Sequence, residues 1–148
     1  MYFVDRDKLE RHLLYLDGLL HEFDQHTFES FLEKLSLERI VQMIVESMLD
    51  IGNMLIDGFI MRDPGSFDDI IDILVDEEVL PTAESEAYKE VIHLRHMLVK
   101  DYLNMEHTVV LDTLKRNYYS IELFSQRIHD YLQGQSGVAN TFSVDTNQ

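Results

Sequence analysis

One short stretch of the chain, Leu94 to Tyr102, gathers side chains that could do chemistry on an anion. Arg95 and Lys100 are cations that can hold a phosphate group. His96 can accept or donate a proton near neutral pH, and Tyr102 carries a hydroxyl group. The stretch contains no Pro and no Gly, so we expect these side chains to project from one helix.

The position of the arginine on that helix is unusual. At about 100° per residue, Arg95 lies within an apolar stripe. The other members of the stripe are Tyr88, Val91, Ile92, Leu98, Val99 and Tyr102. Because an unpaired charge on a core-facing stripe is costly, Arg95 should meet a carboxylate or line a cleft, unless it extends to solvent at the edge of the fold. The carboxylates that could meet it are Glu46, Asp50 and Asp57.

A second face of the same helix carries Lys89, His93, His96 and Lys100, at spacings of four, three and four. In an acidic protein this stripe is where an anion would bind. The alternative is a solvated face whose cations pair with the acidic residues of the preceding helix.

Two metal-binding patterns touch this second face, and both are incomplete. Glu90 and His93 form a Glu-x-x-His pair of the kind that binds di-iron in helical bundles, but the sequence holds no second pair. His93 and His96 lack a third ligand nearby. The chain has 0 Cys, which excludes thiolate metal sites and disulfides. We therefore predict no metal and no cofactor.

The overall composition limits the partners. A net charge of -16 argues against broad nucleic-acid binding, which needs a basic surface, so DNA is not an expected partner. The N-terminal residues are charged almost at once, and no stretch reaches the roughly 18 apolar residues of a membrane span. A soluble cytoplasmic protein with no membrane contact is the expectation.

Hydrophobic periodicity predicts an all-α, antiparallel bundle of about five helices. The expected helices are residues 5–23, 36–60, 66–79, 82–104 and 108–132. We expect one domain over residues 1–132, and a polar, flexible tail over 133–148.

Particular residues should start these helices and fill the core. Ser36, Ser66 and Thr82 are predicted to cap the second, third and fourth helices. The first helix should bury Leu9, Leu13, Leu16, Leu20 and Phe23. Phe67 is expected to face inward. The stretch before Ser36 is expected to be irregular, with Phe28, Phe31, Leu32 and Leu35 still to be buried.

Residues 95–102, Arg-His-x-x-x-Lys-Asp-Tyr, resemble the signature of HEPN domains, specifically of the HepT-like toxin family. The family pattern is an Arg, four residues, a His, one residue and a Tyr. The likeness extends to Ile44–Asn53, to Val79–Pro81 and to the long closing helix. It covers about Leu9 to Leu132.

This resemblance implies an all-α homodimer that cleaves RNA without a metal. The Arg and His of the signature would meet in a cleft between the protomers. Arg95 would stabilise the charge that develops when a 2′-hydroxyl attacks the neighbouring phosphate. Tyr102 would be the residue to which a partner nucleotidyltransferase antitoxin attaches AMP units, silencing the toxin.

Lys100 stands where the family has its His. A lysine ordinarily has a pKa of about 10.4, so it can hold a phosphate but is a poor base. His96 lies one turn earlier and could carry the proton instead. Residues 95 and 100 lie about 140° apart on an ideal helix, so a cleft between protomers or a distorted helix would have to bring them together. The predicted catalytic set is Arg95, Lys100 and His96, with activity weakened by the lysine.

A different class of function remains open from the residues alone. The protein could be a non-catalytic, dimeric helical module that binds a protein or a nucleotide through the stripe from Lys89 to Lys100. RNA cleavage that is lost in Arg95→Ala would favour the enzyme. Tight binding without cleavage would favour the module.

Overall fold

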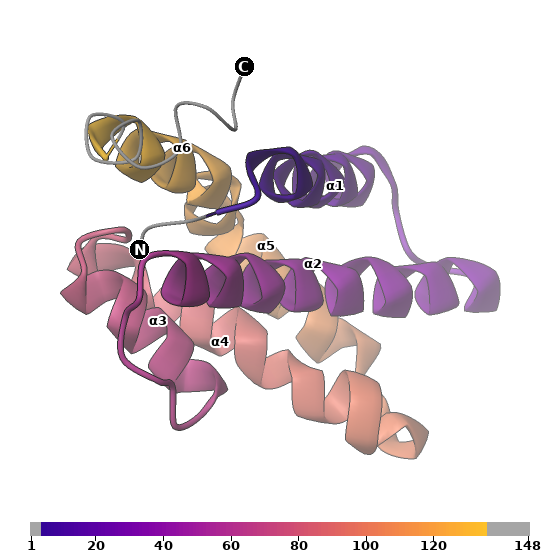
Figure 1. The fold of residues 1–148 in the computed structure, drawn as a ribbon. Helices are drawn as coiled ribbons and strands as arrows, with labels where there is room; N and C mark the ends of the chain where they lie inside the picture. The colour runs from indigo at the N-terminus through magenta and orange to yellow at the C-terminus, as the bar shows by residue number, and fades with distance from the viewer. Residues whose placement is uncertain (1–3, 136–148) are drawn as a thin grey trace.

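The computed structural model describes residues 4–135, and within that part of the chain there are helices and no β-strand (Figure 1). The α-helices are α1 (Arg6–Gln25), α2 (Phe31–Gly58), α3 (Phe67–Asp76), α4 (Ser85–Arg95), α5 (His107–Glu122) and α6 (Phe124–Gly134). The short helical segments are η1 (Thr82–Glu84), η2 (His96–Lys100) and η3 (Tyr102–Asn104). The all-α prediction is confirmed. Most of the expected tail, residues 136–148, lies outside the described residues.

The bundle is built around α2, whose 28 residues make it about 42 Å long. Figure 1 shows α1 lying along α2 in the opposite direction, α4 crossing below it and α5 returning behind it. The five predicted core positions of α1 are all buried, since leucines and a phenylalanine three and four residues apart share one helical face. In the described residues no helix has the length and hydropathy needed to cross a membrane.

The start of α2 differs from the prediction. Ser30 caps the helix: its Oγ accepts from the backbone N of Glu33 at 3.1 Å, and the Glu33 carboxylate accepts from the Ser30 backbone N at 2.8 Å. The predicted cap, Ser36, is wrong, because this residue lies inside the helix and donates its hydroxyl to the Leu32 carbonyl. As a result Leu32 and Phe31 lie on the exposed first turn rather than in the core.

The next two predicted caps had opposite outcomes. Ser66 caps α3 as predicted, with its Oγ accepting from the backbone N of Asp69 at 3.1 Å. Thr82 does not cap α4 with its side chain. It begins the 3₁₀ turn η1, and α4 starts at Ser85 without a side-chain cap.

The predicted last helix is divided in two at Leu123, where the chain bends (Figure 1). The Leu123 backbone N bonds to the Ser120 carbonyl at 3.2 Å, a tightened turn that ends α5. Phe124 then buries its ring against Tyr88, with centroids 5.5 Å apart. The three-four spacing of apolar residues continues across the bend, so periodicity could not reveal it.

A buried polar cluster joins α6 to the start of α4. Glu84 Oε1 accepts from the Tyr88 hydroxyl at 2.7 Å and from Arg127 Nε at 3.1 Å, and Glu84 Oε2 lies 2.5 Å from Arg127 Nη2. Burial opposes ionisation of Glu84, but the bonds from Arg127 and Tyr88 outweigh it and lower the pKa of this carboxyl. Burial, together with Glu84, raises the pKa of Tyr88. The cluster is therefore a satisfied ion pair inside the fold.

Candidate functional site

Arg95 is held by a carboxylate from α2. Its Nε donates to Glu46 Oε1 at 2.6 Å, and the two side chains are about one quarter exposed. The prediction that Arg95 meets a carboxylate is thereby confirmed, with Glu46 as the partner. Among residues 4–135 nothing accepts a hydrogen bond from Nη1 or Nη2 of Arg95. These two nitrogens form the fork that binds carboxylate or phosphate, so the arginine can still take an anion.

The helix changes geometry directly after Arg95. The backbone N of Asp101 bonds to the His96 carbonyl at 2.9 Å, five residues back, which makes η2 a π-helical turn. A π-turn holds one extra residue and rotates the residues beyond it by about 100°. By this count from ideal geometry, the angle between Arg95 and Lys100 around the helix axis falls from about 140° to about 40°. The local distortion that the sequence required for these two cations to meet is therefore present in the helix.

Tyr102 does not share the apolar face of Arg95, contrary to the prediction. It begins η3, after the π-turn, and is 62% exposed. The prediction assumed an unbroken α-helix to Asn104, in which residues seven apart align. The extra residue in η2 turns Tyr102 away from the apolar face of Arg95.

His96 and Lys100 are exposed side chains without a partner among the described residues. An exposed lysine that forms no ion pair in an acidic protein is available to an incoming anion. The histidine is open to solvent one turn before it and could exchange a proton there. Both therefore fit the predicted anion-binding face.

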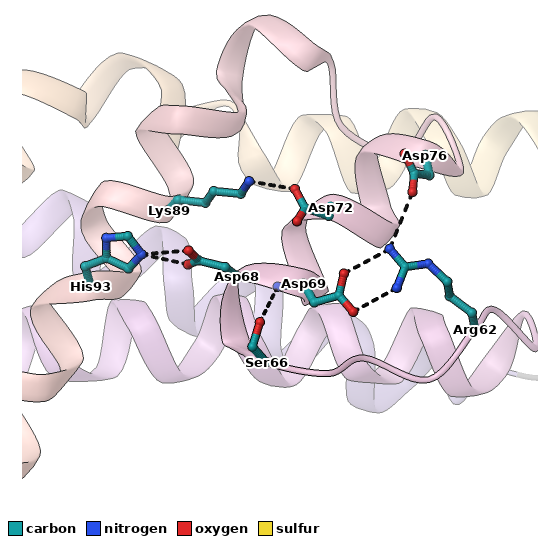
Figure 2. Close-up of polar contacts among 8 residues, drawn as sticks. All are labelled: Arg62, Ser66, Asp68, Asp69, Asp72, Asp76, Lys89 and His93. Carbon is teal, nitrogen blue, oxygen red and sulfur yellow. Dashed lines mark hydrogen bonds and ion pairs between the residues drawn. The ribbon is translucent and has the colours of Figure 1, made fainter.

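Lys89 and His93, the other two members of that face, are already paired with α3 (Figure 2). Lys89 Nζ lies 2.6 Å from Asp72 Oδ1, and His93 Nε2 lies 2.8 Å from both carboxylate oxygens of Asp68. Asp72 raises the pKa of Lys89. For these two residues the alternative prediction, a solvated face paired with acidic residues, is confirmed. The free part of the stripe is its C-terminal half.

Arg62 binds a neighbouring face of α3 (Figure 2). Arg62 makes a two-pronged bond to Asp69 at 2.8 and 2.9 Å and reaches Asp76 at 3.5 Å. The Arg62 bond and the backbone N of Gly65 lower the pKa of Asp69. Asp68 and Asp72 bind α4, whereas Asp69 and Asp76 bind Arg62, so two neighbouring faces of α3 are both held by ion pairs.

Phe67, at the first position of α3, lies beside the candidate arginine. The guanidinium carbon of Arg95 stands 4.7 Å from the centre of the Phe67 ring, within cation–π range. The ring is 47% exposed, so the prediction that Phe67 faces the core is wrong. Its place in the helical pattern suggested burial, and only its contact with Arg95 links it to the site.

The Glu-x-x-His pair of α4 does not converge on one point. The Glu90 carboxylate bonds to Arg116 and Asn117 of α5, whereas His93 is directed to Asp68 of α3. Within residues 4–135 no three His, Asp or Glu side chains gather as metal ligands would. The contacts of Glu90 and His93 are those of helix-to-helix packing.

Comparison with known proteins places these features in a family. The family described as "Ribonuclease HepT-like" matches residues 9–128. The protein named "Putative RNase YutE" from Bacillus subtilis (strain 168) is 42% identical over 143 residues, which span 96% of this chain and 99% of that protein.

Solved structures agree in fold. A structure of YutE from Bacillus subtilis, described as a cytosolic protein of unknown function, has a TM-score of 0.89 and 43% identity over 91% of this chain and 95% of that one. A chain from a toxin-antitoxin crystal structure with AMP-PNP has a TM-score of 0.71 at 17% identity, covering 81% of this chain and 96% of that one, and so shares the fold. Together, the match over residues 9–128 and the close relative place this protein in the ribonuclease HepT-like family.

Proposed function

We propose that the protein is a metal-independent endoribonuclease of a toxin-antitoxin system, with its site at Arg95, His96 and Lys100. The observation that carries this proposal is the state of Arg95. Glu46 accepts from its Nε, no residue within 4–135 accepts from its two terminal nitrogens, and the extra residue of the π-turn reduces, on ideal helical geometry, the angle between Arg95 and Lys100. The name of the Bacillus subtilis relative, "Putative RNase YutE", supports the same interpretation.

The chemistry needs a base, an acid and a cation. The 2′-hydroxyl of one nucleotide loses its proton and attacks the adjacent phosphorus, the bond to the 5′-oxygen breaks, and that oxygen takes up a proton. The products are a 2′,3′-cyclic phosphate and a free 5′-hydroxyl, so this step consumes no water. Arg95 stabilises the negative charge on the phosphate, Lys100 holds the same group, and His96 moves the proton.

Lys100 sets the level of activity in this proposal. A protonated lysine supports phosphate binding but gives little base catalysis. If His96 carries the proton alone, cleavage is slower than in an enzyme with a histidine at position 100. Restoring that histidine should therefore raise the rate.

A homodimer completes the proposed site. Several large apolar side chains are exposed at the end of the bundle where α2 and α5 begin. They are Phe31, Leu32, Leu35, Leu103 and Val109. His107 Nε2 lies 2.7 Å from Glu38 Oε2, a contact that joins the first residue of α5 to the N-terminal part of α2. Exposed apolar surface gathered at one end of a fold is typical of an interaction site, and a second copy bound at Leu103 would lie beside η2, which ends three residues earlier.

The proposed partner is a nucleotidyltransferase antitoxin that acts on Tyr102. The family resemblance supplies this partner, and the related fold of the toxin-antitoxin chain is compatible with it. Tyr102 is an exposed residue, which transfer of an AMP unit to its side chain requires. Attachment of a bulky, charged group two residues from Lys100 would obstruct an RNA phosphate there.

The test is cleavage of single-stranded RNA by purified protein in EDTA, with a DNA oligonucleotide of the same sequence as control. Wild type should cut RNA slowly and leave DNA intact, because DNA lacks the 2′-hydroxyl. Arg95→Ala should abolish cutting and Lys100→His should accelerate it. Wild type and Lys100→His that bind RNA tightly but never cut it would replace the enzyme with the non-catalytic binding module.

A further inference from the structure

Phe67 is an exposed aromatic ring next to the candidate phosphate-binding arginine. Its ring centre lies 4.7 Å from the guanidinium carbon of Arg95, and 47% of the residue is open to solvent. The arginine occupies one side of the ring. The remaining exposed surface is apolar and adjoins a cation whose two terminal nitrogens are unengaged within residues 4–135.

The backbone that carries this ring is held in place by contacts of the residues before and after it in the chain. Ser66 caps the helix directly before it, Asp68 directly after it bonds to His93 of α4, and Asp69 bonds to Arg62 (Figure 2). When the helical turn that carries a ring is already held by such contacts, the ring loses little conformational freedom as a ligand stacks on it. Phe67 is therefore an exposed side chain on a backbone segment that these contacts hold in place.

The same contacts reduce the repulsion that the acidic α3 would exert on RNA. Asp68 is paired with His93 and Asp72 with Lys89, so the two carboxylates that face α4 each have a positively charged or protonatable partner. An RNA phosphate at Arg95 therefore meets a less negative surface than the overall charge of the chain implies.

We propose that Phe67 is a stacking platform for an unpaired nucleobase of the RNA whose phosphate Arg95 binds. This inference rests on the proposed function and names the class of substrate: RNA with unpaired nucleotides at the cut. Bases splayed out of a helix stack on aromatic rings and guanidinium planes, and a phosphate adjoins each of them. Every base has a flat π-face, so the platform selects unpaired nucleotides without selecting a base.

The experiment compares two oligonucleotides of equal charge. One is a short single-stranded RNA with 2′-fluoro sugars, which cannot attack the phosphate, and the other is the same backbone without bases. The ratio of their dissociation constants, measured by fluorescence anisotropy, isolates stacking from phosphate binding. Wild type should prefer the base-containing strand, and Phe67→Leu should reduce this preference on the order of tenfold.

Matched variants separate stacking from a structural effect. Phe67→Tyr keeps the ring and should keep the preference. Tyr119→Leu removes a ring that is 74% exposed on α5 and should also leave the preference unchanged. Arg95→Ala should weaken binding of both strands and leave their ratio near that of wild type, because it removes a phosphate contact.

The outcomes distinguish this inference from the proposed function. If wild type cuts RNA and Arg95→Ala does not, while Phe67→Leu keeps the full preference for bases, only the platform is overturned. A folded wild-type protein that binds neither strand and cuts no RNA overturns both. Should Phe67→Leu fail to fold, the wild-type ratio still decides, since equal affinity for the two strands rules out any stacking platform.

Discussion

Nε of Arg95 lies 2.6 Å from Oε1 of Glu46, a residue 49 positions earlier on a different helix. The bond uses Nε, so that within residues 4–135 the end-on fork of Nη1 and Nη2 has no acceptor. Two such side chains, each about one quarter exposed, are held more firmly than an exposed surface pair. Glu46 is thus a positioning residue for the arginine in the proposed reaction.

Removing Glu46 should therefore lower the rate of RNA cleavage. We expect Glu46→Ala to reduce kcat by about 10- to 100-fold, because Arg95 loses the contact that sets its orientation. Glu46→Gln keeps an oxygen acceptor, so its kcat should lie between those of wild type and Glu46→Ala. The control is Asp50→Ala, an exposed acid on the same helix. Single-turnover cleavage is the measurement, and a Glu46→Ala rate equal to that of Asp50→Ala would exclude the positioning effect.

His96 should be required for cleavage. If it moves the proton, His96→Ala should lose about 100-fold or more in rate, the usual contribution of acid–base catalysis. His21→Ala removes another exposed histidine, on α1, and should cut at the wild-type rate. Cleavage of RNA by the two variants in EDTA is compared. An undiminished rate in His96→Ala would eliminate this histidine as the proton carrier.

Tyr102 should be the site of nucleotide attachment by a nucleotidyltransferase antitoxin. Incubation with such a partner and ATP should add the mass of one or more AMP units to wild type and to Tyr119→Phe. Tyr102→Phe should gain none. The control tyrosine is at least as accessible, since Tyr102 is 62% exposed and Tyr119 is 74% exposed. Intact-protein mass spectrometry is the measurement, and an unchanged gain in Tyr102→Phe would move the modification elsewhere.

Two glycines inside helices should respond in opposite ways to alanine. A Cβ at Gly52 would lie 2.6 Å from Cγ2 of the buried Ile70, which forces α3 away from α2, whereas a Cβ at Gly18 would meet nothing within 4 Å. We expect Gly52→Ala to cost about 1–3 kcal/mol. Gly18→Ala should gain about 0.5–1 kcal/mol through its higher helix propensity. Chemical denaturation measures both, and equal shifts would contradict the close approach of α3.

Glu84 should make the fold sensitive to acid. Its pKa is lowered in the folded protein from an ordinary value of 4.5, so its stabilising contribution is present above about pH 4.5 and is lost as the pH falls through the lower folded value. Wild type should therefore lose more stability than Glu84→Gln between pH 5 and about pH 3. Thermal unfolding across this range is the measurement. Parallel curves for the two proteins would show that this ion pair does not contribute.

Much of the helical framework was predictable from the sequence. The stripe from Leu9 to Phe23 is buried as expected, and Ser66 caps α3. Both depend on contacts within a few residues, where helical geometry leaves little choice. The start of α2 was also encoded locally, by a Ser30-x-x-Glu33 capping box. The prediction missed this capping box because the apolar residues after Ser30 suggested an irregular, buried stretch instead of the first turn of a helix.

Other features depend on forces that act at longer range. The bend at Leu123 interrupts no hydrophobic period, and the π-turn from His96 to Lys100 occurs without Pro or Gly. A helix that packs against several others can exchange one hydrogen-bond pattern for another at small cost, and the neighbours decide where it does so. Periodicity assumes an unbroken 3.6-residue turn, which is why it places Tyr102 on the wrong face.

The sequence by itself determined the helical class, the stripe that carries Arg95 and the family signature in residues 95–102, because these depend on residue type and spacing. Only the tertiary structure decided which acid meets Arg95, which members of the cationic stripe stay free, and that Phe67 stands beside the arginine. The physical reason is that a charge in a helical bundle is satisfied by whatever neighbouring helices bring to it, and that neighbour lies far away in the chain.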